Sequence, residues 1–284
     1  MVTTQLVWFQ GNSRLNTGKH VKAEDVINTA LSRPKSSVCP LLRTVRGTIE
    51  QFASGVLVQI GEARFLLTAA HATDEKDIMI PGTQGLTGAS GQYSYTRLPS
   101  SGERKTDLYD IAFVRLDEDV VANLHPDFSF LNAYDANLED RMASGDAYSV
   151  IGFPARRSSS VGSFVETSLL VLTGSGVGSS EYEDLGLSTN HHLLLRFRRK
   201  KAIDFKTRRR SAPCLPEGMS GGGIFAWSKK IPDPKHLSQP HLVGVVHTHD
   251  SSLNAFLGTR LLCYIRCIRD QHPDLPIMRE ADLF

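Results

Sequence analysis

From Pro40 onward the chain is a succession of short apolar runs separated by turn-forming residues, and this pattern constrains its fold more than any other feature. The runs are "GVLVQI", "ARFLLTAA", "DIAFVRL", "AYSVIGF", "SLLVLTG", "HLLLRF", "GGIFAW" and "LVGVVHT". Many short strands with frequent Gly and Pro between them are typical of an all-β barrel or sandwich. The sequence therefore predicts an all-β fold.

Two segments, one toward each end of the chain, have helical spacing instead. In "KAEDVINTALS", residues 22–32, the apolar residues share one helix face: Val26, Ile27, Ala30 and Leu31. In "RLLCYIRCIRDQ", residues 260–271, the same spacing is found at Leu261, Leu262, Ile265 and Ile268. We expect a short helical N-terminal extension packed on the domain, and a C-terminal helix.

Composition and charge narrow the class of protein. The chain has 284 residues, of which 40% are hydrophobic and 22% charged, enough for one large or two small domains. A net charge of +2 creates no strong field for polyanions, so nucleic acid is not an expected partner.

Targeting and cysteine signals point to one compartment. We find neither a basic, apolar-cored leader nor an apolar run of about 18 residues, so no membrane association is expected. The cysteines have neither zinc-site nor disulfide spacing: Cys39, Cys214, Cys263 and Cys267. These signals predict a cytoplasmic protein with reduced thiols and no metal.

One loop, "EGMSGGGIF", packs four glycines around Ser220. A glycine cluster costs backbone entropy on folding, so it is expected where the chain turns tightly or approaches another group closely. A Gly- and Ser-rich surface loop is also common, and the loop alone leaves both interpretations open.

Two further stretches supply the groups that a serine nucleophile requires. His71 follows an apolar run in "FLLTAAHAT", and Asp110 precedes another in "LYDIAFVRL". A hydroxyl attacks a carbonyl, an imidazole takes and returns its proton, and a buried carboxylate orients the imidazole. The glycines would let the backbone N–H groups of Gly218 and Ser220 point at the developing oxyanion.

Together, "TAAH", "DIAFVRL" and "GMSGGGIF" resemble the three signature motifs of the chymotrypsin/trypsin-like serine proteases, in that family's His–Asp–Ser order. The likeness runs from about Cys39 to Asp270, and "SGVLV" is similar to the bacterial branch. It implies two antiparallel six-stranded β-barrels with the catalytic cleft between them. Asp107 is a competing carboxylate, but Asp110 directly abuts "IAFVRL", as in the family pattern.

The resemblance also implies a domain organisation. We expect an N-terminal extension over residues 1–37, a first barrel over residues 38–135, and a second barrel with the C-terminal helix over residues 136–284. The first barrel would contribute His71 and Asp110, and the second would contribute Ser220.

Two positions depart from the digestive enzymes of that family. Met219 stands where those enzymes have the Asp that pairs with a freshly cleaved N-terminus, so activation by cleavage is not expected. Six residues before Ser220, trypsin-like enzymes have an Asp in the specificity pocket that binds Lys or Arg; this chain has Cys214 there, so we expect Cys214 to line a pocket without that acid.

The opposite wall of the specificity pocket is expected from "VVHTHD", where His247 and His249 would share one face of an extended strand. They would favour Glu, Gln or a small to medium apolar residue over Lys or Arg before the cut. Two polar residues at a strand end are an alternative interpretation, and no third ligand makes them a metal site.

The segment "RFRRKKAIDFKTRRR", Arg196–Arg210, is strongly basic. It is either a solvated hairpin or a docking site for an acidic partner, and its place before the pocket loop would put it near the cleft.

These features predict a serine endopeptidase without cofactor, acting on protein or peptide substrates through an acyl-enzyme. The alternative is a triad-bearing protease domain kept latent, acting as a protein-binding module or a partner-controlled effector.

Overall fold

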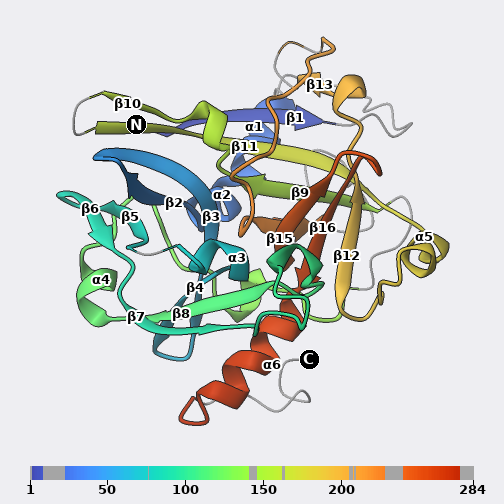
Figure 1. Ribbon diagram of the computed structural model, residues 1–284. Helices are drawn as coiled ribbons and strands as arrows, with labels where there is room; N and C mark the ends of the chain where they lie inside the picture. The colour runs from blue at the N-terminus through green and yellow to red at the C-terminus, as the bar shows by residue number, and fades with distance from the viewer. Residues whose placement is uncertain are drawn as a thin grey trace.

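The computed structural model describes residues 2–8, 23–75, 77–140, 146–161, 164–204, 207, 209–227 and 239–275. Two β-sheets form the body of this part of the chain and pack against each other (Figure 1). Short helices lie between some of the strands in the chain, and one longer helix follows the last strand. The predicted all-β class, with a C-terminal helix, is confirmed.

The first sheet contains seven strands in the order β6-β5-β2-β3-β4-β8-β7, every neighbouring pair antiparallel. Its strands are β2 (Val38–Val45), β3 (Thr48–Ile60), β4 (Ala63–Ala69), β5 (Met79–Gly82), β6 (Gly85–Gly88), β7 (Gly91–Tyr95) and β8 (Ile111–Leu116). The sheet curls into a half-barrel around buried side chains such as Leu57, Phe65 and Phe113.

The second sheet closes into a barrel of six strands. Its strands are β9 (Ala147–Gly152), β11 (Phe164–Gly176), β12 (His192–Arg196), β14 (Gly223–Ala226), β15 (His241–Asp250) and β16 (Ala255–Arg260). They pair antiparallel in a ring, β9-β11-β12-β16-β15-β14, and β14 returns to β9. The short β10 (Ser159–Val161) pairs with the start of β11. Side chains that include Tyr148, Leu172 and Ile224 fill its interior.

The resemblance implied two six-stranded barrels; the structure has one closed six-stranded barrel, and its first sheet is a curled half-barrel. Among the described residues, the edge strands β6 and β7 each pair with one neighbour only, so the first sheet stays open. The segment between β8 and β9 adds isolated backbone bridges to this sheet, from Leu131 to Val58 and from Leu124 to Gly82.

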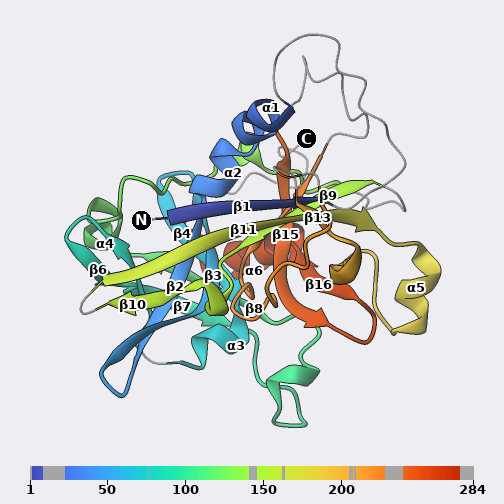
Figure 2. The ribbon, with the colours of Figure 1, turned by 90° about the horizontal axis from the view of Figure 1, so that it is seen from above.

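The N-terminal segment contributes more than the predicted helix. The helical pattern forms α1 (Ala23–Ala30) and α2 (Ser32–Ser36), with Ile27 and Leu31 buried; Lys22, where we expected it to begin, lies outside the described residues. In addition, β1 (Val2–Trp8) pairs parallel with β11 and antiparallel with β13 (Ile203–Asp204). Figure 2 shows β1 running alongside β11.

The predicted C-terminal helix is α6 (Leu261–Gln271). Its buried face carries Leu261, Tyr264 and Ile268, while Leu262 and Ile265 are only half-buried. The helix contacts β8 of the first sheet as well as β15 and β16 of the barrel, so it ties the two sheets together. None of the helices in the described part of the chain has both the length and the apolar character needed to cross a bilayer.

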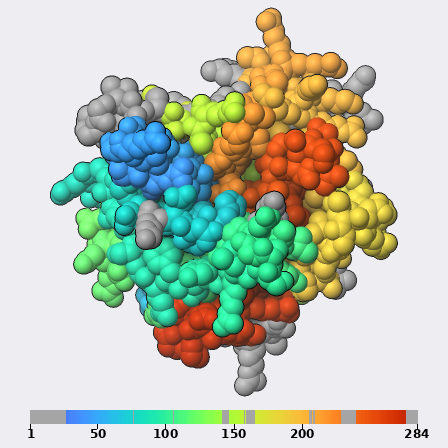
Figure 3. Space-filling view, in the orientation of Figure 1, coloured from blue at the N-terminus to red at the C-terminus, as the bar shows by residue number. Residues whose placement is uncertain are grey.

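The remaining helices are short: α3 (Ala70–Thr73), α4 (Glu118–Ala122) and α5 (Ser179–Asp184). On the face seen in Figure 3, residues of the first sheet, coloured blue to green, adjoin residues of the barrel, coloured yellow to red. The side chains of interest come from both sides of this junction.

Candidate active site

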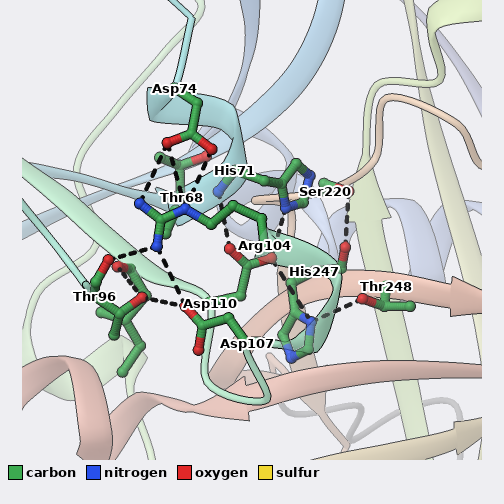
Figure 4. A network of polar contacts seen from close by, with 12 residues as sticks. Thr68, His71, Asp74, Thr96, Arg104, Asp107, Asp110, Ser220, His247 and Thr248 are labelled. Atoms are coloured by element: carbon green, nitrogen blue, oxygen red, sulfur yellow. Dashed lines mark hydrogen bonds and ion pairs between the residues drawn. The ribbon is translucent and has the colours of Figure 1, made fainter. Parts of the chain in front are cut away.

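His71 and Asp110 form a close pair in the first sheet. His71 lies in α3, directly after β4, and Asp110 directly precedes β8, the strand that pairs with β4. The imidazole Nδ1 lies 2.5 Å from Asp110 Oδ2, and the backbone N–H of His71 donates to Asp110 Oδ1 at 2.9 Å (Figure 4). The two contacts fix both the position and the orientation of the imidazole ring.

The backbone of Asp110 explains how its carboxylate reaches His71. Its φ of +47° lies in the left-handed region, which Asp tolerates better than most residues but which costs about 1–3 kcal/mol. The Ala70 N–H donates to the Asp110 carbonyl at 2.9 Å and holds this conformation. Asp107, the competing carboxylate, instead accepts from the Thr96 hydroxyl at 2.6 Å and lies 3.5 Å from Arg104.

Asp110 is a buried carboxylate that stays ionised. Burial by itself would raise the pKa of Asp110, but the hydrogen bond from His71 and the charges of His71 and His247 outweigh it, so the pKa lies below its usual value. Only 5% of its side chain is exposed, against 38% for His71. An anion is thus held behind an accessible imidazole.

The loop around Ser220 requires two of its glycines. Gly218 and Gly221 have φ values of +89° and +86°, in the region that favours glycine. A Cβ on Gly221 would lie 1.9 Å from the Ser54 carbonyl oxygen, and one on Gly218 would lie 2.6 Å from the Ala155 nitrogen. The loop therefore bends sharply while pressed against β3 and the segment after β9.

The same bends direct two backbone N–H groups away from the protein's own acceptors. The Glu217 carbonyl accepts from the Ala155 N–H at 2.7 Å, and the Met219 carbonyl accepts from the Gly222 N–H at 2.9 Å. The N–H and C=O of one peptide unit point in opposite directions. In the described part of the chain, the Gly218 and Ser220 N–H groups donate to no acceptor. They are free to donate to an external acceptor.

The Ser220 hydroxyl itself does not point to His71. It donates to the backbone carbonyl of His247 at 2.9 Å. Figure 4 shows this bond beside the His71–Asp110 pair, with Ser220 and the imidazole on the same side of the site. The hydroxyl must give up this bond before it can donate to the imidazole.

His247 lies behind Asp110. Its ring is almost wholly buried, with Nδ1 3.0 Å from the Thr248 hydroxyl and 4.0 Å from Asp110 Oδ2. Burial is the main reason why the pKa of His247 falls to about 4; the charge of Asp110 opposes this shift, and the charges of His71 and His192 add to it. At neutral pH the ring is an uncharged neighbour of the carboxylate.

The prediction that His247 and His249 share one strand face is wrong, because a β-bulge interrupts β15 between Val246 and Thr248. His249 lies among aromatic rings instead, 5.6 Å from Phe197 and 5.1 Å from Phe256 between ring centroids. Burial lowers the pKa of His249.

Cys214 is half-buried and packs against the hydrophobic cluster that contains Phe197, Phe256 and Met219. Cys214 and His249 therefore both border the aromatic end of the barrel. A substrate-binding role for Cys214, His247 and His249 stays a prediction.

The basic segment forms an exposed surface on the barrel side. Arg198, Lys200, Lys201, Arg209 and Arg210 are exposed, whereas Lys206 and Arg208 lie outside the described residues. Arg199 is half-buried and donates from Nε to the Pro213 carbonyl at 2.6 Å. This bond connects the segment to the loop that leads to Ser220.

Sequence reasoning missed Gln51 and Ser54, which lie on β3 against the Ser220 loop. The Ser54 hydroxyl donates to the Gly218 carbonyl at 2.9 Å, and the Ser54 N–H donates to the Ser220 carbonyl at 2.8 Å. The signal available was weak: two polar residues inside a strand that is otherwise apolar at buried positions. Within the described residues, no three His, Cys, Asp or Glu side chains gather as metal ligands.

These features define a chymotrypsin-like fold, with a His–Asp pair on one sheet facing a serine loop on the other. Among solved structures, the chain is similar to neuropsin, a serine protease expressed in the limbic system of mouse brain. The TM-score is 0.55 at 14% sequence identity, and the match covers 84% of this chain and 96% of neuropsin. No protein-family model matches the chain, and no curated protein matches its sequence.

Proposed function

We propose that the chain is a serine endopeptidase that hydrolyses peptide bonds through an acyl-enzyme. The observation that carries the proposal is the His71–Asp110 pair, together with the backbone N–H groups of Gly218 and Ser220 that donate to no acceptor in the described part of the chain. Each group has the chemistry of one catalytic role, and the similarity to the neuropsin fold supports the same reaction class.

The reaction follows from the roles of these atoms. Ser220 Oγ bonds to the substrate carbonyl carbon while its proton passes to His71 Nε2, and the carbonyl oxygen becomes an oxyanion. The Gly218 and Ser220 N–H groups donate to that oxyanion. When the intermediate collapses, the C–N bond breaks and the imidazolium returns the proton to the leaving amine. Water then repeats the sequence on the acyl-enzyme and releases Ser220.

Asp110 supports both protonation states of His71. Its contact with Nδ1 keeps the proton on that nitrogen, so Nε2 is the basic atom that faces the serine. Its negative charge stabilises the imidazolium that forms during attack. Because its pKa lies below the usual value, the carboxylate stays ionised throughout.

One observation favours the latent form of the same domain as a second candidate. The Ser220 hydroxyl is bonded to the His247 carbonyl, so nucleophile and base are not yet joined. A domain restrained in this state would act as a partner-controlled effector. The two candidates differ in whether the isolated chain reacts.

Protein or peptide substrates follow from the proposed reaction, and we further propose that acidic segments dock on the basic segment. The exposed cations Arg198, Lys200 and Lys201 would supply the attraction, and the Arg199 bond to Pro213 would place that attraction beside the serine loop.

Labelling with a fluorophosphonate tests the proposal. The wild-type chain should be labelled at Ser220, and Ser220→Ala and His71→Ala should not be labelled, since the first lacks the nucleophile and the second its base. Ser252→Ala removes an exposed hydroxyl in the turn before β16 and should be labelled like wild type. Equal labelling of wild type and Ser220→Ala would overturn the assignment, and an unlabelled wild type would favour the latent form.

A further inference from the structure

The serine loop is tied to the first sheet by two buried polar side chains of β3, Gln51 and Ser54. Gln51 is 3% exposed and Ser54 is fully buried. Both donate to one acceptor, the Gly218 carbonyl: Gln51 Nε2 at 3.2 Å and Ser54 Oγ at 2.9 Å. This carbonyl precedes the peptide unit that leads to Ser220, so β3 restrains the loop at Gly218.

Ser54 is held rigidly for this task. Its hydroxyl accepts from the Phe153 N–H at 2.9 Å, and its own carbonyl accepts from the Thr68 hydroxyl at 2.8 Å. Its N–H donates to the Ser220 carbonyl at 2.8 Å. Ser54 thus contacts the loop at both ends of the turn that contains the nucleophile, and these contacts leave its hydroxyl hydrogen committed to Gly218.

The Gln51 amide is oriented by carbonyl groups alone. Its Nε2 lies 2.8 Å from the Ala53 carbonyl oxygen and 2.7 Å from that of Phe153, in addition to the Gly218 contact. Its Oε1 atom is buried and has no partner among the described residues.

Beyond the exposed ion pair of Glu217 with Arg156 at 2.9 Å, in which both side chains are 60% exposed, neutral contacts hold the described part of the loop here. Met219, between Gly218 and Ser220, is 1% exposed and packs into the apolar cluster of the barrel. Its side chain offers neither a hydrogen bond nor an ion pair. Glycine at position 218 permits many backbone conformations, so the orientation of the neighbouring peptide units depends on neutral hydrogen bonds from other elements.

We infer that Gln51 and Ser54 are positioning residues that hold the Gly218–Ser220 loop in the form that binds an oxyanion. The inference rests on the proposed function. The loop can then bind an oxyanion in the intact chain, because both donors come from β3 and neither depends on a new chain terminus. The two residues act on the reaction only through the Gly218 and Ser220 N–H groups.

Loss of either donor should lower turnover more than substrate binding. In Ser54→Ala and Gln51→Met, kcat should fall about 10- to 100-fold, because a misplaced oxyanion donor costs transition-state stabilisation. KM should change by less than about threefold, because the substrate's other contacts remain. Affinity for a peptidyl boronic acid, whose oxygen occupies the oxyanion position, should fall in parallel with kcat.

A matched control separates positioning from loss of stability. Ser149 is also fully buried and bonds to Thr173 and the Trp227 indole within the barrel. Ser149→Ala should destabilise the fold as much as Ser54→Ala does but leave kcat close to the wild-type value. Hydrogen exchange of the peptide covering residues 214–222 should quicken in Ser54→Ala and Gln51→Met, and not in Ser149→Ala.

The outcomes distinguish this inference from the proposed function. If wild type neither turns over peptides nor binds the boronic acid, the proposed function fails, and the hydrogen-exchange comparison still decides whether β3 restrains the loop. If wild type is active but Ser54→Ala and Ser149→Ala lose kcat equally, or loop exchange is unchanged in both β3 variants, the inference is overturned.

Discussion

Protonation of His247 should destabilise the protein at mildly acidic pH. The ring is buried between Asp110 and the barrel, and burial lowers its pKa to about 4, against 6.5 for an ordinary histidine. In the unfolded chain the histidine takes up a proton near pH 6.5, whereas the folded protein resists it down to about pH 4. The unfolded state therefore binds more protons in this window, and the free energy of unfolding falls as pH falls.

The size of the effect follows from the two pKa values. At pH 5 the unfolded histidine is almost fully protonated and the folded one is not. The free energy of unfolding therefore falls by about 2 kcal/mol between pH 7.5 and pH 5. Asp110 does not interfere, because a carboxyl whose folded pKa is lowered loses its contribution only as pH falls below its ordinary value of 3.8. Burial also lowers the pKa of His192, His249 and His272, so only a difference between variants isolates His247.

Urea unfolding at pH 7.5, 6.5, 5.5 and 5.0 measures that difference. His247→Gln cannot titrate, so it should lose about 2 kcal/mol less than wild type over this range. His125→Gln replaces an exposed histidine and should follow wild type. Parallel losses in wild type and His247→Gln would refute the reasoning, because the buried ring would then carry no pH-dependent stability.

Three other expectations are open to direct tests. Because Met219 has no carboxylate to receive a new N-terminus, the intact chain should cleave peptides without processing near residues 38–50, and mass spectrometry of the active protein checks this; an inert chain that processing switches on would contradict it. In a peptide library varied at the residue before the cut, cleavage should favour Glu, Gln or small to medium apolar residues, and His249→Ala should reduce cleavage after Glu more than after Leu. A dominant preference for Lys or Arg would exclude this pocket. Reversing charge at Lys200 and Lys201 to Glu should lower kcat/KM for peptides with acidic flanks several-fold at low salt and little at high salt; an unchanged salt dependence would remove the basic segment from substrate binding.

Local patterns in the sequence were enough to predict the class of fold. Strand-like runs and the helical spacing after Arg260 depend on neighbouring residues only, and both are present in the structure. The resemblance to the protease motifs implied that Asp110 lies beside His71, and the structure brings them together because each residue adjoins one of two paired strands. The roles of these residues, and of Ser220, remain proposals.

Features that depend on distant contacts were not predictable. β1 forms because β11, more than 150 residues later, offers it a partner. The bulge that separates the environments of His247 and His249 changes the strand register by a single residue, which no pattern in "VVHTHD" reveals. Gln51 and Ser54 gain their importance only from the Gly218 carbonyl brought against them by folding.

The most direct test of the account is a map of new protein termini in a cell lysate incubated with the purified chain. Wild type should generate new internal N-termini that share a preference at the cleaved position, and Ser220→Ala at the same concentration should generate none above background. Identical termini with wild type and Ser220→Ala, or none with either, would contradict the claim that this chain is a serine endopeptidase with Ser220 as its nucleophile.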